Sequence, residues 1–227
     1  PIGDSAPVLL ALDAVLLLQR GPTLRRLPLA EFYLDYMKNA LQPGEFLRAI
    51  EVPLPAADAP QAQALRLREQ EQVLEIGFGG GRLLAQMAKI VTHGHLSGLD
   101  ASPIMVNRVR RKFQALVYKG IMDIRLGSAE KLPFTDSAFD KVASVNAIFY
   151  WRDPARGIRE ACRVLRPAGL FVLTFTAKED LDRQEFGIPS FYEDEVISML
   201  RKAGFYRIDV SRDRDAHRAF LILTAEK

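Results

Sequence analysis

From residue 72 onward, short apolar runs alternate with longer stretches whose apolar residues recur every three or four positions. Runs of the first kind indicate β-strands, and the longer period indicates helices. The pattern predicts strands over residues 72–76, 95–100, 121–126, 141–145, 170–175, 206–211 and 219–225, with helices over about 82–92, 103–117, 154–165 and 192–203. This alternation predicts an α/β fold, a mainly parallel sheet with helices on both faces.

The first 56 residues follow a different pattern. An apolar stretch over residues 8–18 and a second short run over 24–27 are separated by Gly-Pro, which predicts two returning strands. Residues 28–41 have helical spacing after a proline, and residues 46–52 alternate as a strand does. We therefore expect a small α+β N-terminal appendage over residues 1–56, a linker over 57–71, and the main domain over 72–227.

Composition and cysteine usage indicate the class of protein and its compartment. The 227 residues are 48% hydrophobic and 26% charged, which is ordinary for a globular chain of one mid-sized domain with an appendage. One cysteine, Cys162, excludes an internal disulfide and suits a reducing, cytoplasmic compartment. The histidines form no ligand spacing, so we expect no metal site.

No segment of the sequence predicts membrane insertion or export. The longest apolar run, residues 8–18, contains Asp13 and is too short to span a bilayer, so we expect no integral membrane segment. The chain starts on Pro1 without a basic leader, which argues against a signal peptide and suggests a start within a longer protein.

The charge pattern favours a small-molecule partner. The net charge of +3 is mildly basic, and the basic residues are scattered apart from Arg108, Arg110, Arg111 and Lys112. This run lies on a predicted helix, where a solvated face is favoured over a nucleic-acid patch. We therefore expect no nucleic-acid partner.

The strongest motif is the stretch from Val73 to Gly81, an apolar run that ends in an acid and three alternate glycines. It predicts a strand, a tight glycine turn and the start of a helix, whose free N–H groups face a ligand over the turn. A dinucleotide fingerprint would need G-x-G-x-x-G, and here the third glycine is replaced by Arg82. A nicotinamide-dependent oxidoreductase is therefore the disfavoured alternative.

The order E-x-G-x-G-x-G resembles motif I of the class I S-adenosylmethionine (SAM) methyltransferases. The seven predicted strands match that family's Rossmann-like sheet, whose last strand runs antiparallel to the others. The resemblance implies SAM as the cofactor and a cradle made of Glu75, Gly77, Phe78, Gly79 and Gly81.

A second acid, Asp100, ends the next predicted strand. A carboxylate there can accept hydrogen bonds from both hydroxyls of a ribose. The alternative is an acid beside a helix N-terminus, because Ser102 and Pro103 begin a helix. Met105 either covers one face of an adenine or packs in the core, and Ala101 and Ser102 complete this part of the expected cofactor site.

Two further segments extend the resemblance. It implies that the residues after the third strand, Ser128, Ala129 and Glu130, hold the adenine, although Glu130 can also be an ordinary loop residue. Asn146 stands at the carboxyl end of the fourth strand, where open α/β sheets place their ligands, and there it would contact the methionine part of SAM. Ala168 departs mildly from the glycine usual in the family's turn before strand five.

The aromatic run Phe149, Tyr150 and Trp151 follows the fourth strand. These rings can face the sulfonium or the acceptor, but three consecutive residues cannot all face one way, so at least one belongs to the core. Methyl transfer mainly requires alignment and exclusion of water, so we assign no catalytic residue; Tyr150 is a candidate base by its position. The motif set is most similar to the branch that methylates small molecules, quinones and lipids.

The beginning of the chain has a different resemblance. Pro1-Ile-Gly-Asp-Ser, Arg26-Leu-Pro-Leu-Ala-Glu-Phe-Tyr and the segment 40–53 resemble the closing part of the FAD-binding domain in xanthine dehydrogenase-type molybdenum hydroxylases. In that family the first of these segments lies beside the flavin. The glycine-rich loops that hold the FAD pyrophosphate are missing. The alternative function is therefore a non-catalytic or FAD-associated fragment fused to a methyltransferase-like domain.

The same resemblance bears on turnover. Helices before motif I usually cover the active site in methyltransferases, and here that region is flavoprotein-like. The segment 176–190 is short for a lid. We therefore expect SAM binding to survive better than turnover.

Overall fold

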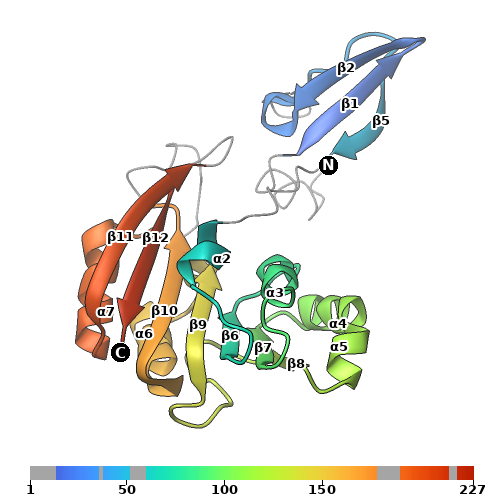
Figure 1. The fold of residues 1–227 in the computed structure, drawn as a ribbon. Helices are drawn as coiled ribbons and strands as arrows, with labels where there is room; N and C mark the ends of the chain where they lie inside the picture. Colours follow the sequence, from blue (N-terminus) through green and yellow to red (C-terminus); the bar gives the residue numbers. More distant parts are fainter. Residues whose placement is uncertain (1–13, 36–37, 52–59, 178–189, 215–218) are drawn as a thin grey trace. The chain divides into compact units, whose positions relative to one another are not determined.

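A computed structural model describes residues 14–35, 38–51, 60–177, 190–214 and 219–227 (Figure 1). The chain divides into two compact units, Pro1–Ala56 and Ala57–Lys227. Each unit has its own buried core, so each is described by itself.

The first unit is built on a three-stranded antiparallel sheet in the order β2-β1-β5. The central strand β1 (Val15–Arg20) pairs with β2 (Thr23–Pro28) and with β5 (Phe46–Glu51). Alternate residues Leu16 and Leu18 point into a small core, because successive strand residues face opposite sides of a sheet. The predicted strands are present wherever the structure describes them, whereas residues 8–13 and 52 lie outside the described part.

The prediction of a helix over residues 28–41 is wrong. The described residues there form a 3₁₀ turn, η1 (Leu29–Glu31), and a two-stranded ladder of β3 (Tyr33–Asp35) and β4 (Lys38–Asn39). A side chain from β2 holds this segment in place. The Arg25 guanidinium donates to the backbone carbonyl of Ala40 at 2.8 Å and to the Glu45 carboxylate at 2.7 Å. These long-range bonds replace the internal bonds that a helix would have made.

The second unit contains a seven-stranded sheet in the order β11-β12-β10-β9-β6-β7-β8. Its strands are β6 (Gln72–Ile76), β7 (His95–Asp100), β8 (Met122–Leu126), β9 (Phe139–Val145), β10 (Leu165–Phe175), β11 (Tyr206–Arg214) and β12 (Ala219–Glu226). The pairs among β6 to β10 are parallel, and β12 is antiparallel to both neighbours. The α/β fold with its reversed last strand is thus confirmed.

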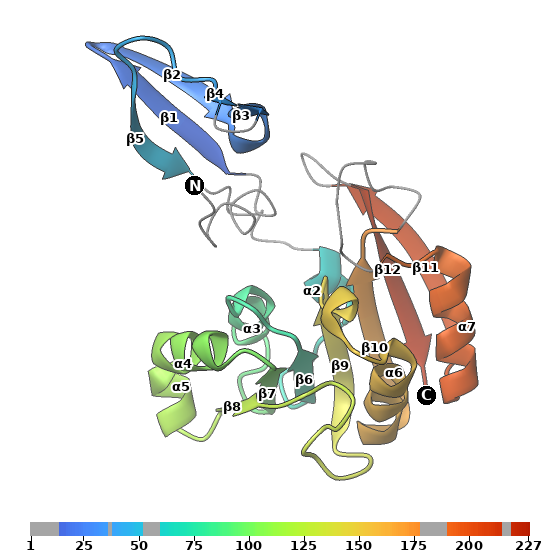
Figure 2. The same ribbon diagram turned by 180° about the vertical axis from the view of Figure 1, so that it is seen from behind.

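Helices cover both faces of this sheet, as predicted. Figures 1 and 2 show α6 (Pro154–Val164) and α7 (Glu193–Ala203) beside β10 to β12, and α3 (Arg82–Met87), α4 (Pro103–Lys112) and α5 (Gln114–Tyr118) beside β6 to β8. Strand residues alternate between two cores: Phe171 belongs to the core under α6 and α7, and Val172 to the core under α3 and α4. A strand buried on both faces appears in the sequence as a continuous apolar run.

One predicted helix is shorter than expected, and another is interrupted. The first ends at Met87 instead of residue 92, because the chain turns back so that the amide of His93 reaches the carbonyl of Glu69 at 2.9 Å. Gly94 passes so close that an added Cβ would lie 2.0 Å from the carbonyl oxygen of Glu71. The second breaks at Phe113, whose ring packs inward, and continues as α5.

Part of the expected linker, residues 57–71, is folded. Residues 60–64 form the short helix α2 (Pro60–Ala64), and Leu65 is fully buried in the core under α3. These residues therefore pack as part of the second unit.

Candidate cofactor site

The glycine turn connects β6 to α3 at the carboxyl edge of the sheet. The amide of Gly77 donates to the carbonyl of Leu99 at 2.7 Å, and the amide of Gly81 donates to the carbonyl of Phe78 at 2.8 Å. Gly77, Gly79 and Gly81 all have positive φ, a conformation that side chains with a Cβ rarely adopt. The turn is therefore fixed by backbone bonds that glycine makes possible.

The three glycines have different surroundings. An added Cβ would lie 2.3 Å from the Cβ of Ala147 at Gly77, and 3.1 Å from side-chain atoms of Val109 and Phe113 at Gly81. At Gly79 an added Cβ would meet no atom of the described residues within 4 Å. Two glycines thus allow the chain to pack, and Gly79 leaves open space on the outer side of the turn. The intervening Phe78 is buried, so only its backbone can face a ligand.

Asp100 joins the glycine turn to the next helix. Its Oδ2 accepts from the amide of Gly79 at 2.9 Å, and its Oδ1 accepts from the amide of Ser102 at 2.9 Å. Each carboxylate oxygen keeps a second lone pair, so both can still accept a hydroxyl. The structure therefore brings the two sequence motifs together, and Asp100 also stands beside the N-terminus of α4.

Two residues after Asp100 have structural roles, one as a helix cap and one as a core contact. The Ser102 hydroxyl accepts from the amide of Met105 at 3.4 Å and caps α4. Met105 is half-buried against the core under α3 and α4, whereas Ala101 is exposed. Of the two interpretations of Met105, the core contact is visible in the structure.

Glu75 is the one strongly perturbed acid of this region. Its side chain is 3% exposed, and its Oε2 has no hydrogen-bond partner in the described part of the chain. Burial raises the pKa of Glu75 to about 8; the backbone of Leu84 opposes this shift by hydrogen bonding, and the negative charge of Asp100 adds to it. Near neutral pH the folded protein therefore holds a proton on this carboxyl group.

Glu130 points toward the chain's own backbone. Its Oε1 accepts from the amides of Arg152 at 2.6 Å and Asp153 at 3.2 Å, while its Oε2 accepts from the hydroxyl of Ser128. Burial alone would raise the pKa of Glu130, but these bonds together hold it below its usual value. Glu130 thus ties the segment after β8 to the start of α6, and Ala129 is buried beside it.

Asn146 has an unusual backbone at the end of β9. Its φ is 51°, and its amide donates to the carbonyl of Thr174 at 2.8 Å. A non-glycine residue with positive φ is uncommon and is found more often at functional sites. The exposed Asn146 side chain lies at the same sheet edge as the glycine turn.

The three aromatic residues after β9 separate as the sequence required. Trp151 packs on α6, where an added Cβ at Gly157 would lie 2.4 Å from its ring. Phe149 stacks on Phe191, with ring centroids 6.1 Å apart, at the edge of the core. Tyr150 is 73% exposed and remains available to a ligand.

The sequence interpretation missed Lys112. Its Nζ donates to the carbonyls of Gly80 at 3.0 Å and Gly81 at 3.1 Å, so a residue at the end of α4 holds the glycine turn. The sequence places Lys112 in a basic run on a helix, and no local signal links it to a turn 31 residues earlier.

Two family models match the chain. The methyltransferase domain matches residues 74–173, which include the glycine turn, Asp100 and Asn146. The FAD binding domain in molybdopterin dehydrogenase matches residues 1–55. The chain is 34% identical over 146 residues to the uncharacterized methyltransferase YdaC of Bacillus subtilis (strain 168), and this match covers 64% of the chain and 77% of YdaC.

The chain belongs to the methyltransferase family. This methyltransferase is also 33% identical over 147 residues to 2-methyl-6-phytyl-1,4-hydroquinone methyltransferase 1 of Oryza sativa subsp. japonica. That match covers 62% of the chain but only 43% of the rice protein. A SAM-dependent methyltransferase from Aquifex aeolicus has the same fold, with a TM-score of 0.61 and 23% identity over 73% of this chain and 89% of that chain.

Family and fold imply S-adenosylmethionine as the methyl donor, as motif I predicted. Three observations show that the site fits such a group: open space over Gly79, a half-buried Asp100 with lone pairs to spare, and a buried Glu75 oxygen that has no partner among the described residues. Of the segment 176–190, which the sequence suggests is short for a lid, residues 178–189 lie outside the described part of this methyltransferase.

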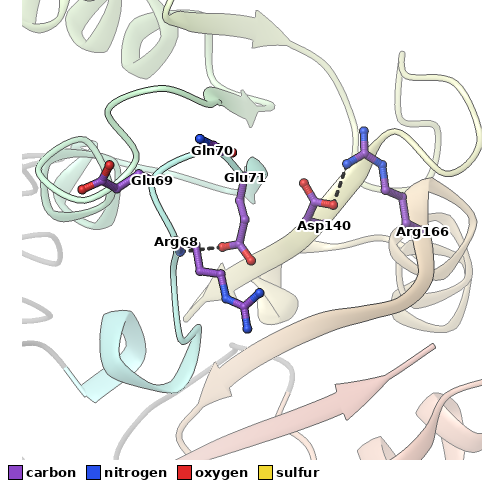
Figure 3. Close-up of a pocket in the computed structure, with 6 residues that line it drawn as sticks. All are labelled: Arg68, Glu69, Gln70, Glu71, Asp140 and Arg166. Atoms are coloured by element: carbon purple, nitrogen blue, oxygen red, sulfur yellow. Dashed lines mark hydrogen bonds and ion pairs between the residues drawn. The ribbon is translucent and has the colours of Figure 1, made fainter.

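Two surface cavities lie away from this site. One of about 450 Å³ is lined by Arg68, Glu69, Gln70, Glu71, Asp140 and Arg166 at the amino edge of the sheet (Figure 3). Asp140 there accepts from the amide of Gln72 at 2.7 Å and from Arg166 at 2.5 Å. The acids that line this cavity bond neighbouring strands and loops, so we assign them a structural role. The second lies beside α5.

The described residues contain no group of three His, Cys, Asp or Glu side chains placed to hold a metal ion. Among the helices that the structure describes, none has the length and apolar character needed to cross a bilayer.

Proposed function

We propose that this methyltransferase binds SAM at the carboxyl edge of its sheet, between the glycine turn, the end of β7 and the end of β9. The observation that carries the proposal is the bond between Gly79 and Asp100, which sets an open turn and a carboxylate side by side. The proposed contacts are made by Glu75, Gly77, Phe78, Gly79, Gly81, Asp100, Ala101, Ser102, Met105, Ser128, Ala129, Glu130 and Asn146. We assign this activity to residues 72–227 and regard residues 1–56 as a separate flavoprotein-like unit.

The proposed residues contact different parts of the cofactor according to their chemistry. Asp100 accepts the ribose hydroxyls, and the backbone of residues 128–130 contacts the adenine. Asn146 and the protonated Glu75 offer hydrogen bonds at the methionine end of the site. The cofactor supplies a methyl group activated by positive sulfur, so the protein has mainly to align the acceptor and exclude water.

The acceptor is proposed to be a small quinone-like or lipid-like molecule, with no nucleic-acid substrate and a cytoplasmic location. The rice relative's name gives a phytyl hydroquinone as its substrate, and the exposed Tyr150 beside the Phe149–Phe191 stack provides an aromatic surface at the same edge. Ring stacking against a planar acceptor is favourable there. The single cysteine supports a reducing compartment.

Calorimetry with S-adenosylhomocysteine tests the cofactor site, and transfer from labelled SAM to 2-methyl-6-phytyl-1,4-hydroquinone tests the acceptor class. We expect cofactor binding to be retained and turnover to be slow. Absence of binding at millimolar cofactor would contradict the site, and binding of NADH instead would favour the oxidoreductase. Tyr150→Phe keeps the ring and removes the hydroxyl, so a base role predicts a large loss of kcat, whereas a stacking role predicts little change.

A second candidate rests on the match of residues 1–55 to the FAD binding domain in molybdopterin dehydrogenase. Under this alternative the chain is a non-catalytic or FAD-associated fragment of a molybdenum hydroxylase flavoprotein subunit joined to a methyltransferase-like domain. The proposed flavin neighbours Asp4 and Ser5 lie outside the described residues. A flavin absorption spectrum of the purified protein, together with mass spectrometry of released nucleosides, distinguishes FAD from SAM.

A further inference from the structure

The segment from residue 101 to 122 concentrates the positive charge of the protein. It contains Arg108, Arg110, Arg111, Lys112 and Lys119 and no acidic residue. Since the whole chain carries +3, the remaining residues together carry −2. The excess positive charge is therefore a local property of α4 and α5 (Figure 1).

These charges are not neutralised by carboxylates in the part of the chain that the structure describes. The Arg110 guanidinium donates to the carbonyl of Ile124 at 2.6 Å, and Arg111 donates to the carbonyl of Asn107 at 3.3 Å. Lys112 is bonded to the glycine turn. Carbonyl partners fix the direction of these side chains and leave their full charge.

Apolar side chains are exposed among the charges. Ile104 is 73% exposed and Tyr118 is 92% exposed. Ile104, Arg108 and Arg111 share one face of α4 by their spacing of four and three residues. Arg111 and Tyr118 both line a recess of about 400 Å³, which connects this face to α5.

We propose that this α4–α5 basic surface, made of Ile104, Arg108, Arg111, Tyr118 and Lys119, docks on an anionic membrane. The proposal rests on the lipid-like acceptor of the proposed function, which would be dissolved in such a membrane. Each basic residue near an anionic bilayer contributes about 1 kcal/mol, and an inserted aromatic or aliphatic side chain provides a second, salt-independent contribution. The binding is weak and reversible.

A membrane fits the surface better than a single-stranded nucleic acid does. Nucleic-acid channels stack successive bases on several aromatic rings along a groove. Here the exposed side chains are one isoleucine in the first turn of α4 and one tyrosine at the end of α5, which do not form a row of aromatic rings. Such a surface suits the boundary between headgroups and acyl chains, where Tyr side chains are enriched.

Vesicle co-sedimentation of the full chain tests the proposal, with phosphatidylcholine alone compared with a mixture containing about one-third phosphatidylserine. We expect binding to the anionic vesicles only, weakened by salt. The double variant Arg108→Gln/Lys119→Gln should bind about 25-fold more weakly, about fivefold for each charge, and Tyr118→Ser should lose the binding that remains at high salt. The matched control is Arg156→Gln/Arg159→Gln, two exposed arginines on α6, which should bind as the wild type does.

S-adenosylhomocysteine affinity is measured on the same preparations. Retained cofactor affinity without vesicle binding overturns the docking surface alone, whereas loss of both in the wild type overturns the proposed function as well. An equal effect of the control pair, or binding of the wild type to a single-stranded RNA oligonucleotide but not to vesicles, also contradicts membrane docking.

Discussion

The backbone amide of Gly79 donates a 2.9 Å hydrogen bond to Oδ2 of Asp100, which joins the glycine turn after β6 to the end of β7. The other oxygen of the same carboxylate accepts from Ser102 at the start of α4. One side chain therefore sets the positions of a turn, a strand end and a helix N-terminus. The turn is open on its outer side at Gly79, so the carboxylate and the space beside it form a single feature of the surface.

Replacing Asp100 with Asn should weaken S-adenosylhomocysteine binding by roughly tenfold or more, because hydrogen bonds to a charged group contribute about 1.5–3 kcal/mol each. Calorimetry measures the change in Kd. Asp123→Asn on the neighbouring strand is the control, since Asp123 bonds the surface residue Arg125. An unchanged Kd in Asp100→Asn would show that the carboxylate does not touch the cofactor.

Glu75 should make the folded state less stable as pH rises. Its pKa is about 8 in the folded protein, against 4.5 when unfolded. Between these values the folded state keeps a proton that the unfolded state has lost, so the free energy of unfolding falls on the order of 1.4 kcal/mol per pH unit and levels off above pH 8. Below pH 4.5 both states are protonated and the contribution is complete.

Glu75→Gln removes this titration while keeping the shape of the side chain. Urea unfolding at several pH values should show the variant gaining stability relative to the wild type from pH 5 to pH 8. A constant difference between the two proteins across this range would mean that Glu75 is ionised in the folded state.

Lys112→Met should raise the KM for SAM about fivefold and leave kcat nearly unchanged, because the lysine acts through the carbonyls of Gly80 and Gly81. Steady-state kinetics separate the two constants. Arg111→Met, one residue earlier and exposed, is the matched control. If Lys112→Met instead lowered kcat and also lowered the melting temperature, the role of the lysine would be purely structural.

Ala168→Gly should stabilise the protein by about 0.5–1 kcal/mol. Ala168 is exposed and has a φ of 60°, a left-handed conformation that costs a residue with a Cβ about 1–2 kcal/mol. Glycine removes this cost, although it adds freedom to the unfolded chain. Urea unfolding measures the gain, and Ala115→Gly in α5 should do the opposite. A loss of stability in Ala168→Gly would contradict the reasoning.

Local sequence patterns were sufficient to predict most of the strands and helices of the second unit. The run ending at Glu75 and the alternate glycines specify a strand and turn whatever surrounds them, because the period of apolar positions and the φ of glycine are local properties. The same reasoning placed Asp100 and Asn146 at strand ends. It failed over residues 28–41, where the helical spacing had no large core to cover and long-range bonds from Arg25 held another backbone path.

From residue 72 onward, the sequence by itself determined the order of strands and helices along the chain, the reversed last strand that the family resemblance implied, and the residue types at the sheet edge. Only the tertiary structure decided which groups meet: Lys112 on the glycine turn, Glu130 on the amides before α6, and the burial that keeps Glu75 protonated. Such contacts join residues far apart in the chain, and their geometry and dielectric surroundings depend on packing that no local period records.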